Sequence, residues 1–352
     1  MKNIKKISTL LLSVVAALSL TGCYKDYVQD YDYSGAYLAY QYDLRTFVVG
    51  EGMQFKIGAV LGGVMKNEYD RDIWYEFDDN LITDDLRFFV PDAETPFNAF
   101  SEMSGRTAVG SVSQDYVKNA VQLSGIKAFT PLPMSTVKIP EGDRFQIKKG
   151  NHTGTITVKA DSAAFLALPG AGSLPYYAIG FRLTSADVDT VLLSRSYEII
   201  ALRYENMLFG NWYHGGKTVV TDASGNVIDT DVYPTSIPSD EKTHEVYTLS
   251  TVAPDAVKTN YRGTGAGSVR ITFSDGKITL ASADAVAIED LGSGYNNAKL
   301  LQDRKIFLNY SFANADGTKS VVTDTLTFRN RIRDGVNEWQ DENPEHYKKD
   351  WL

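Results

Sequence analysis

The feature that most constrains the fold is a series of three glycine-containing turns, each set between segments of alternating apolar and polar residues. The turns lie at residues 222–226 (DASGN), 274–277 (SDGK) and 314–318 (NADGT). Every other residue is apolar from Val269 to Phe273, before the second turn, and again from Ile278 to Leu280, after it. Asp-Gly between two strands is a strong hairpin signal because glycine supplies the positive φ that the turn requires. Consecutive hairpins without helical crossovers predict an antiparallel meander, closed as a barrel or packed as a sandwich.

The first half of the chain has the same period of two. Apolar residues alternate with others from Tyr177 to Leu183, and they do so again on both sides of the turn at residues 149–151. This period is typical of half-buried strands. We therefore expect an all-β protein of two domains, with a boundary near Glu205.

Several segments of the first half resemble the domain of unknown function that opens many Bacteroidetes outer-membrane lipoproteins of glycan-utilisation loci. The resemblance rests on residues 132–133 (LP), 139–142 (IPEG), 145–150 (FQIKKG), 154–158 (GTITV), 177–185 (YAIGFRLTS) and 199–206 (IIALRYEN). It implies an N-terminal immunoglobulin-like β-sandwich. In that family the sandwich precedes either a catalytic domain, such as a family-18 glycoside hydrolase, or a non-catalytic β domain.

The second half resembles the non-catalytic β domain of such lipoproteins, on residues 209–212 (FGNW) and 336–347 (VNEWQDENPEHY). Gly210 and Trp212 also have the Gly-x-Trp form that opens lipocalin-type barrels. In those barrels the tryptophan closes one end, and an arginine of the final strand packs over its ring. Arg329, Arg331 and Arg333 lie where that strand is expected. The alternatives for this domain are a lipocalin-like barrel and another closed or sandwich-like β domain.

The N-terminus has the parts of a secretory signal. Three lysines precede an apolar stretch at residues 7–20, which at 14 residues is shorter than the roughly 20 needed to span a membrane. The following Leu-Thr-Gly-Cys at residues 20–23 resembles a bacterial lipobox, whose cysteine carries the lipid. We expect lipidation at Cys23, and two or more acyl chains hold a protein firmly on a membrane. Lys25 and Asp26 loosely resemble the export signal of surface lipoproteins, so we expect outer-membrane anchoring that faces the cell surface, with a periplasmic orientation as the alternative.

Cysteine content and charge exclude several classes of function. Cys23 is the only cysteine, so disulfides, zinc–thiolate sites and cysteine nucleophiles are excluded once it is lipidated. Without the three lysines of the leader, 32 basic residues remain against 44 acidic ones, a net charge of −12. An acidic chain without a basic run is a poor partner for nucleic acid.

Motifs of catalysis and metal binding are missing from the sequence. The four histidines are scattered, and no His-Glu-x-x-His, Gly-x-Ser-x-Gly or calcium loop occurs. The acidic residues do not form the spaced Asp-x-x-Asp-x-Asp-x-Glu run of family-18 hydrolases. The glycines at residues 263–267 lead into a strand instead of a helix, so we expect a flexible loop there and no phosphate cradle. We expect no enzyme activity, no cofactor and no metal.

Binding of a sugar remains compatible with the composition. Sugars stack on aromatic rings, and the chain has 21 Tyr, 16 Phe and 4 Trp, although β-sheets select aromatic residues anyway. Aromatic residues beside acids, or in what we expect to be flexible polar loops, are the candidates for ligand contact. The candidate ligand-binding residues are Trp74, Tyr75, Tyr213, His214, Tyr295 and Asn296.

Together these features predict an accessory glycan-binding lipoprotein of a polysaccharide-utilisation system. Its expected partners are the membrane, through Cys23, a glycan, and other envelope proteins of the same system. The alternatives are a structural or adhesive protein that binds other proteins, and a lipocalin-like carrier of a small apolar ligand. The expected organisation is a signal peptide (1–22), a tether (23–35), an immunoglobulin-like sandwich (36–205), a barrel-like antiparallel meander (206–333) and a C-terminal tail (334–352).

Overall fold

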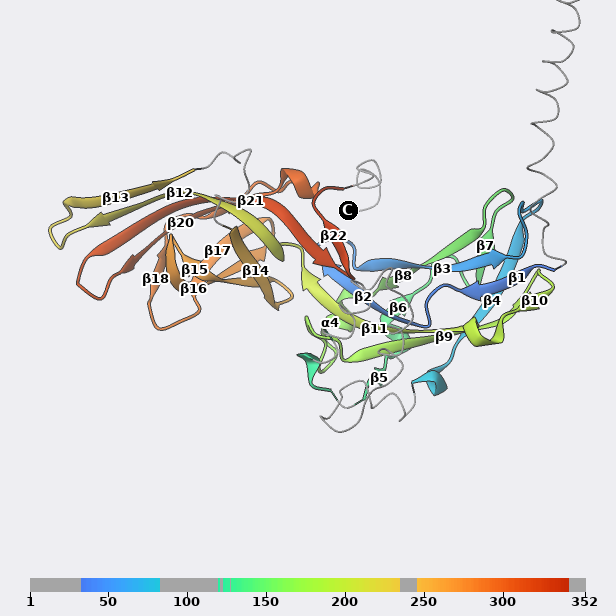
Figure 1. The fold of residues 1–352 in the computed structure, drawn as a ribbon. Helices are drawn as coiled ribbons and strands as arrows, with labels where there is room; N and C mark the ends of the chain where they lie inside the picture. The colour runs from blue at the N-terminus through green and yellow to red at the C-terminus, as the bar shows by residue number, and fades with distance from the viewer. Residues whose placement is uncertain (1–32, 83–119, 121–122, 127, 235–245, 342–352) are drawn as a thin grey trace, which may run out of the picture.

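The computed structural model describes residues 33–82, 120, 123–126, 128–234 and 246–341. The chain is all-β, as its sequence predicts, and consists of an immunoglobulin-like β-sandwich and a nearly closed antiparallel barrel placed end to end (Figure 1). Cys23 lies outside the described residues. Within the described ranges, no helix has the length and apolarity to cross a membrane.

Two sheets form the sandwich. The first has the order β10 (Thr190–Val191), β1 (Gly35–Leu38), β3 (Gln54–Gly62), β8 (Thr153–Ala160), β6 (Val137–Lys138). The second has the order β2 (Tyr42–Val49), β11 (Tyr197–Asn206), β9 (Tyr177–Ala186), β4 (Arg71–Phe77), β7 (Arg144–Ile147), with β5 (Thr130–Pro131) beside β9. Short helical turns connect them: η1 (Asp79–Leu81), η3 (Met134–Thr136), α4 (Ser162–Leu166) and η4 (Leu193–Arg195).

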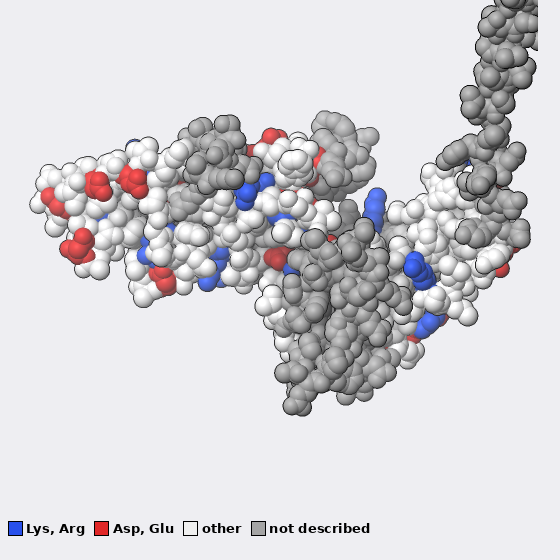
Figure 2. Space-filling view, in the orientation of Figure 1, with Lys and Arg blue, Asp and Glu red and all other residues white. Residues whose placement is uncertain are grey.

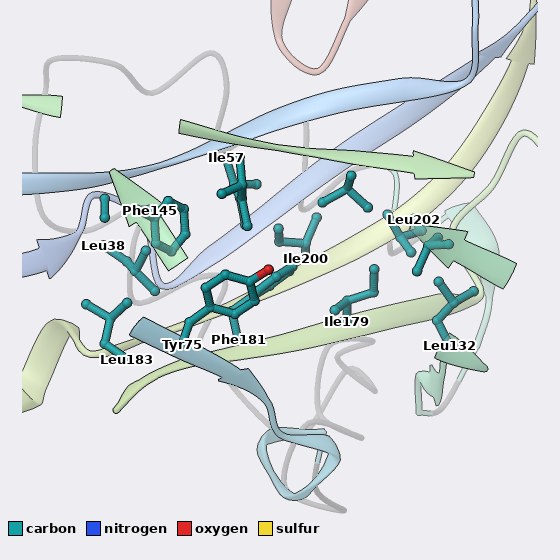
Figure 3. Close-up of a cluster of buried hydrophobic side chains, with 14 of the residues drawn as sticks. Leu38, Ile57, Tyr75, Leu132, Phe145, Ile179, Phe181, Leu183, Ile200 and Leu202 are labelled. Carbon is teal, nitrogen blue, oxygen red and sulfur yellow. The ribbon is translucent and has the colours of Figure 1, made fainter. Parts of the chain in front are cut away.

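The sandwich core lies between the two sheets and is apolar. Alternate residues of β9 and β11, such as Phe181 and Ile200, point into it and meet Phe145 of β7 (Figure 3). This alternation follows from the pleat of a strand, which directs successive side chains to opposite faces. Tyr75 of β4 packs in the same cluster, and its hydroxyl donates to the Gly142 carbonyl oxygen at 2.6 Å.

The second domain is one curled antiparallel sheet. Its order is β17 (Lys277–Ser282), β16 (Gly265–Ser274), β15 (Ala256–Arg262), β14 (Val246–Ala253), β12 (Gly210–Thr221), β21 (Lys319–Arg333), β20 (Lys305–Ala313), β18 (Ile288–Asp290). Three further strands attach to its edges: β13 (Val227–Tyr233) to β12, β19 (Gly294–Tyr295) to β20, and β22 (Val336–Glu338) to β21. The turn η6 (Leu301–Asp303) precedes β20.

Pairing of the first and last long strands closes the barrel on one side. β12 and β21 pair from Thr221↔Lys319 to Asn211↔Asn330, with a register shift between Asn211 and Trp212. At the opposite seam, β17 and β18 approach without a ladder, and the Leu280 amide donates to Asp290 Oδ2 at 2.9 Å. The result is a barrel with one incomplete seam. The three turns predicted from the sequence connect β12 to β13, β16 to β17 and β20 to β21, which confirms the hairpins.

Buried ion pairs join the two domains. Glu51, in the turn between β2 and β3, accepts from Arg331 of β21 at 2.8 and 2.7 Å and pairs with Arg304 at 2.7 Å. Burial alone would raise the pKa of Glu51, but Arg331 and Arg304 outweigh it and hold this pKa well below its ordinary value. Around these charges, Val48 of the sandwich joins the apolar cluster of the barrel.

The hairpin of β21 and β22 adds a second contact to this junction. Asp334, at its turn, accepts from the Thr46 amide at 3.2 Å and from the Thr46 hydroxyl at 2.6 Å, and so covers part of the free edge of β2. We expected residues 334–352 to be a tail laid on the surface. Instead, residues 336–338 form a strand whose hairpin docks on the sandwich, while 342–352 lie outside the described residues.

Candidate functional site

Polar side chains lie inside the barrel, around His214 and Asp324. Alternate residues of β12 point inward, and the register of β12 with β21 brings His214 close to Asp324. His214 Nε2 lies 3.0 Å from Asp324 Oδ2, and both side chains are fully buried. The Tyr233 hydroxyl donates to Asp324 Oδ1 at 2.5 Å and lies 3.0 Å from the Thr218 hydroxyl. We call His214, Asp324 and Tyr233 the polar core.

A column of aromatic rings connects the polar core with the surface. Tyr261, which is 38% exposed, stacks on Tyr247 with 5.0 Å between ring centroids. Tyr247 in turn stacks on His214 at 4.1 Å, and Tyr233 covers the imidazole at 4.5 Å. Burial, reinforced by Asp324, raises the pKa of Tyr233 well above its ordinary value, so its hydroxyl stays protonated and can donate.

A pocket of about 370 Å³ opens at the barrel end where the β15–β16 and β20–β21 turns lie. Its volume is within the range of roughly 300–1,000 Å³ that is typical of small-molecule sites. Thr218 connects it to the polar core, because this hydroxyl lines the pocket and contacts Tyr233. We call it the mouth pocket; its lining includes Thr218, Arg262, Thr264, Phe312, Asn314 and Ser320.

Arg262 is the fixed centre of the mouth pocket. Its guanidinium lies 5.0 Å from the Phe312 ring centroid, and its Nη2 lies 2.5 Å from each Asp284 carboxylate oxygen. A hydrogen bond from the Val286 amide, supported by Ser268 and Arg262, lowers the pKa of Asp284 to about 2, so this carboxylate stays charged. A Cβ at Gly267 would lie 2.8 Å from the Arg262 Cβ. We expected these glycines in a flexible loop; instead, Gly267 lies in β16 and leaves room for the arginine.

The mouth pocket can bind a polar ligand that has one apolar face. Phe312 provides a half-buried ring, while Thr218, Thr264 and Asn314 provide hydroxyl and amide groups around it. Sugars combine a CH face with hydroxyls in this way. The three polar side chains are held in place within the protein, Thr218 by Tyr233, Thr264 by Asp231, and Asn314 by Thr318 and Ser320. Across the described residues, no group of His, Cys, Asp and Glu is arranged to hold a metal ion.

Of the six candidate ligand residues, only His214 belongs to the polar core. Tyr213 and His214 lie within β12, although we expected them in a loop. The reason is visible at Gly216, where the φ is 145° and a Cβ would lie 2.2 Å from the Thr323 carbonyl oxygen. Gly216 therefore allows β12 and β21 to approach closely and does not mark a flexible loop. Tyr213 packs with Arg329, whose guanidinium lies 5.6 Å from its ring centroid.

Tyr295 and Asn296 are neighbours near the start of β20, whereas the mouth pocket lies at the end of that strand. Tyr295, in β19, is buried, and its hydroxyl donates to the Ala298 carbonyl oxygen at 2.9 Å. The Asn296 side chain organises the loop after β19, because its Oδ1 accepts from the Lys305 amide at 3.0 Å. We return to Tyr295 below, since it lines a different pocket.

The other two candidates, Trp74 and Tyr75, lie in the sandwich. Tyr75 is a core residue, whose ring packs edge-on or tilted against Phe77, Phe145 and Phe181. Its buried position and its hydrogen bond to Gly142 give it a structural role. Trp74 is half-buried in β4, next to Tyr75. The six residues therefore do not form one site.

An arginine of the last strand lies over an aromatic ring near the Gly-x-Trp motif, as expected, but the ring is Phe209 instead of Trp212. Trp212 is fully buried, donates from Nε1 to the Leu208 carbonyl oxygen at 3.0 Å and packs edge-on against Phe328. The arginine of the last strand, Arg331, lies over Phe209 at 5.1 Å and not over Trp212. Glu51 of the sandwich binds the Arg331 guanidinium and so holds it in its position over Phe209.

Sequence reasoning missed the residues that make the mouth pocket and most of the polar core. Asp324 carried a usable signal, because it is a charged residue at an inward position between the apolar Val322 and Leu326. Arg262, Asp284 and Phe312 carried none, since they meet only through the curl of the sheet.

No protein-family model matches the sequence, and a search of curated proteins found no match. Among solved structures, a structural-genomics protein of unknown function from Bacteroides ovatus has a TM-score of 0.57 and 17% identity, covering 88% of this chain and 99% of that one. The likeness shows a shared fold. The match to a multidomain protein including DUF1735, also from Bacteroides ovatus, covers 88% of this chain and 100% of that one at 11% identity. Its TM-score of 0.35 is too low to show a shared fold.

Proposed function

We propose that this protein is a non-catalytic, lipid-anchored accessory glycan-binding protein of the cell surface, and that the mouth pocket binds the glycan. The observation that carries this proposal is the lining of the pocket, in which the Phe312 ring is surrounded by hydroxyl, amide and guanidinium groups. The fold shared with a Bacteroides protein is consistent with the family suggested by the sequence.

The position of the mouth pocket supports this function. The β20–β21 turn lies at the end of the molecule opposite β1 and β10, close to which the described chain begins (Figure 1). With a lipid at Cys23, the sandwich would act as a spacer, and the pocket would lie at the far end from the anchor. Acidic side chains gather over this end, with few basic ones (Figure 2), which disfavours a polyanionic ligand.

The environment of His214 supports a role without catalysis. A general base must come within hydrogen-bond reach of the proton that it removes. The His214 ring is instead covered by Tyr247 and Tyr233 and paired with Asp324, and its side chain is fully buried. This arrangement holds the imidazole in the barrel wall, away from a substrate.

The filled interior of the barrel disfavours the alternative of a carrier for an apolar ligand. Trp212, Tyr247 and Tyr310 are fully buried large side chains of this interior. They occupy the space in which a lipocalin-like carrier would hold its ligand.

Glycan binding is tested with the soluble chain 24–352 on a glycan array, followed by titration of each hit. Phe312→Ala should lower the affinity about tenfold, because the lost ring surface corresponds to about 1.5 kcal/mol. Phe307→Ala is the matched control, since Phe307 lies on the same strand but is exposed on the opposite face. A silent array, or equal effects of the two variants, would refute glycan binding at the mouth pocket.

Anchoring is tested separately. Cys23→Ala should move the protein from the membrane to the soluble fraction, and protease added to intact cells should cleave the wild type if it faces outward. Retention of the variant on the membrane would contradict lipidation at Cys23. Complete protection from protease would place the protein on the periplasmic side.

Protein binding through β13 is the second candidate function. β13 pairs with β12 along one edge, and no described strand pairs with the other. Val227, Ile228 and Val232 are 62%, 56% and 71% exposed, and an exposed apolar edge strand can accept a strand from a partner. A photo-crosslinker at position 232 should then give one discrete product in cells, whereas position 252, exposed on β14, should give none; equal patterns would argue against this candidate.

A further inference from the structure

A second pocket, of about 210 Å³, lies where the barrel meets the sandwich. We call it the junction pocket. Gly50 contributes from the β2–β3 turn of the sandwich, and Met207 from the connection between β11 and β12. A molecule in this pocket would therefore contact both domains. The side chains that line the barrel side include Phe273, Tyr295, Asn297, Lys299 and Arg304.

One part of the junction pocket is apolar and aromatic. The Phe273 and Tyr295 rings meet edge-to-face at 5.3 Å, and Met207 adds a thioether. Burial raises the pKa of Tyr295 to about 12, and its hydroxyl donates to the Ala298 carbonyl oxygen. Tyr295 therefore offers a neutral ring and not a polar group to a ligand. A flat aromatic molecule can stack on one of these two rings and meet the edge of the other, the two arrangements that aromatic pairs prefer.

The charged residues that line the junction pocket are both cations. In a chain with a net charge of −9, Lys299 and Arg304 line it, and no carboxylate does. Arg304 is buried and engaged, since it pairs with Glu51 at 2.7 Å and donates to the Met207 carbonyl oxygen at 2.8 Å. Lys299 is exposed, and no ion pair within the described residues involves it.

Two acidic side chains of this region already have partners. Glu51 binds the two arginines, and Asp341 Oδ2 accepts from the Leu301 amide at 2.7 Å. None of the residues that line the pocket has a carboxylate that could compete with a ligand for the Lys299 ammonium. An ammonium in this position attracts an anion whose apolar body fits against the rings.

We propose that the junction pocket binds a small organic carboxylate with a flat apolar face. The carboxylate pairs with Lys299, and the flat face lies against Phe273 and Tyr295. This site is distinct from the mouth pocket, and its occupation does not depend on glycan binding there. Because Gly50 belongs to the sandwich and Met207 to the connection between the domains, the ligand also strengthens the contact between the domains.

The test is a titration of the chain 24–352, labelled at the methionine methyl groups, with benzoate, benzyl alcohol and inorganic phosphate. The Met207 methyl lines the pocket and should shift with saturation on adding benzoate, while Met65, in the sandwich loop after β3, should not. Benzyl alcohol lacks the charge and phosphate lacks the ring, so we expect the affinity of each to be lower than that of benzoate by about tenfold or more. Lys299→Gln should lower the benzoate affinity about tenfold, because it removes one charge-assisted contact.

Lys305→Gln is the matched control, since Lys305 is exposed at the start of β20 and does not line the pocket. Both lysines are exposed, so neither variant should disturb folding. Equal affinity for benzoate and benzyl alcohol would overturn the proposal, as would an unchanged affinity in Lys299→Gln. Failure of benzoate to shift the Met207 methyl would overturn it as well. None of these results would bear on glycan binding at the mouth pocket.

Discussion

The sandwich and the barrel bury their polar side chains in different places. Between the sheets of the sandwich, the core is a continuous apolar cluster, and its charged residues, such as Asp43 and Glu198, lie at the edge strand β2 and its neighbour β11. In the barrel, by contrast, His214 and Asp324 lie inside, at the centre of a network of hydroxyls and rings.

This difference is consistent with the proposed roles of the sandwich as a spacer and of the barrel as the binding domain. An apolar core gives stability without offering groups to a ligand, whereas buried polar groups are costly unless they are fully hydrogen-bonded. In the barrel, the network reaches the surface through Thr218, which contacts both Tyr233 and the mouth pocket. This connection supports the proposal that the barrel binds the ligand and that the sandwich acts as a spacer.

The largest predicted effect concerns the cluster that joins the two domains. Glu51→Gln should destabilise the protein by about 3–5 kcal/mol, because Arg331 and Arg304 would stay buried without their shared carboxylate. Urea unfolding followed by Trp74 or Trp212 fluorescence, in variants that keep only that one of the four tryptophans, reports each domain. The two transitions should coincide in the wild type and separate in Glu51→Gln.

The matched control for this prediction is Glu289→Gln. Glu289 pairs with Lys319 at 3.3 Å, but both side chains are more than half exposed. An exposed pair contributes about 1 kcal/mol or less, so this variant should unfold like the wild type. Equal losses in the two variants would show that the buried cluster does not hold the domains together.

Much of the fold could be predicted from the sequence, because its signals are local. The alternation from Tyr177 to Leu183 lies within β9, and each Asp-Gly or Ser-Gly turn connects two paired strands. The misplacement of Tyr213 and His214 has a local cause as well. Adjacent glycines at 215 and 216 resemble a loop, and only the pairing of β12 with β21 shows that Gly216 allows close contact between these strands.

The sites could not be predicted in the same way, since their residues meet only in three dimensions. Arg262 and Phe312 come from strands 50 residues apart in the sequence, and Glu51 and Arg331 are separated by 280. The pattern of apolar and polar residues around each of these side chains does not indicate which distant residue it will contact. The single inward charge of Asp324 is the exception, because a charge in an apolar row must find a buried partner.

The second prediction concerns the edge of the sandwich. Burial raises the pKa of Asp43 to about 6, against the opposing effect of Arg45, and Asp334 adds to the rise. The folded protein thus holds this proton more tightly than the unfolded chain, whose aspartates have a pKa of about 3.9. The stability should therefore fall as the pH rises from about 4 through 6.

Asp43→Asn removes this contribution. Between about pH 4.5 and 6.5, the wild type should lose about 2 kcal/mol more than the variant in its free energy of unfolding, measured with urea at several pH values. This result would locate one source of the loss of stability with rising pH at the sandwich edge and not in the barrel. Parallel pH profiles of the two proteins would contradict it.

The smallest predicted effect compares one hydroxyl from each core. Tyr75 donates to a neutral carbonyl oxygen of Gly142, whereas Tyr233 donates to the Asp324 carboxylate. Hydrogen bonds to charged groups contribute about 1.5–3 kcal/mol and neutral ones about 1 kcal/mol, so Tyr233→Phe should cost about 1 kcal/mol more than Tyr75→Phe. The same fluorescence-monitored urea unfolding, with Trp212 for the barrel and Trp74 for the sandwich, measures both losses. Equal losses would mean that the barrel network is no more demanding than an ordinary apolar core, and the contrast between spacer and binding domain would then depend on the mouth pocket alone.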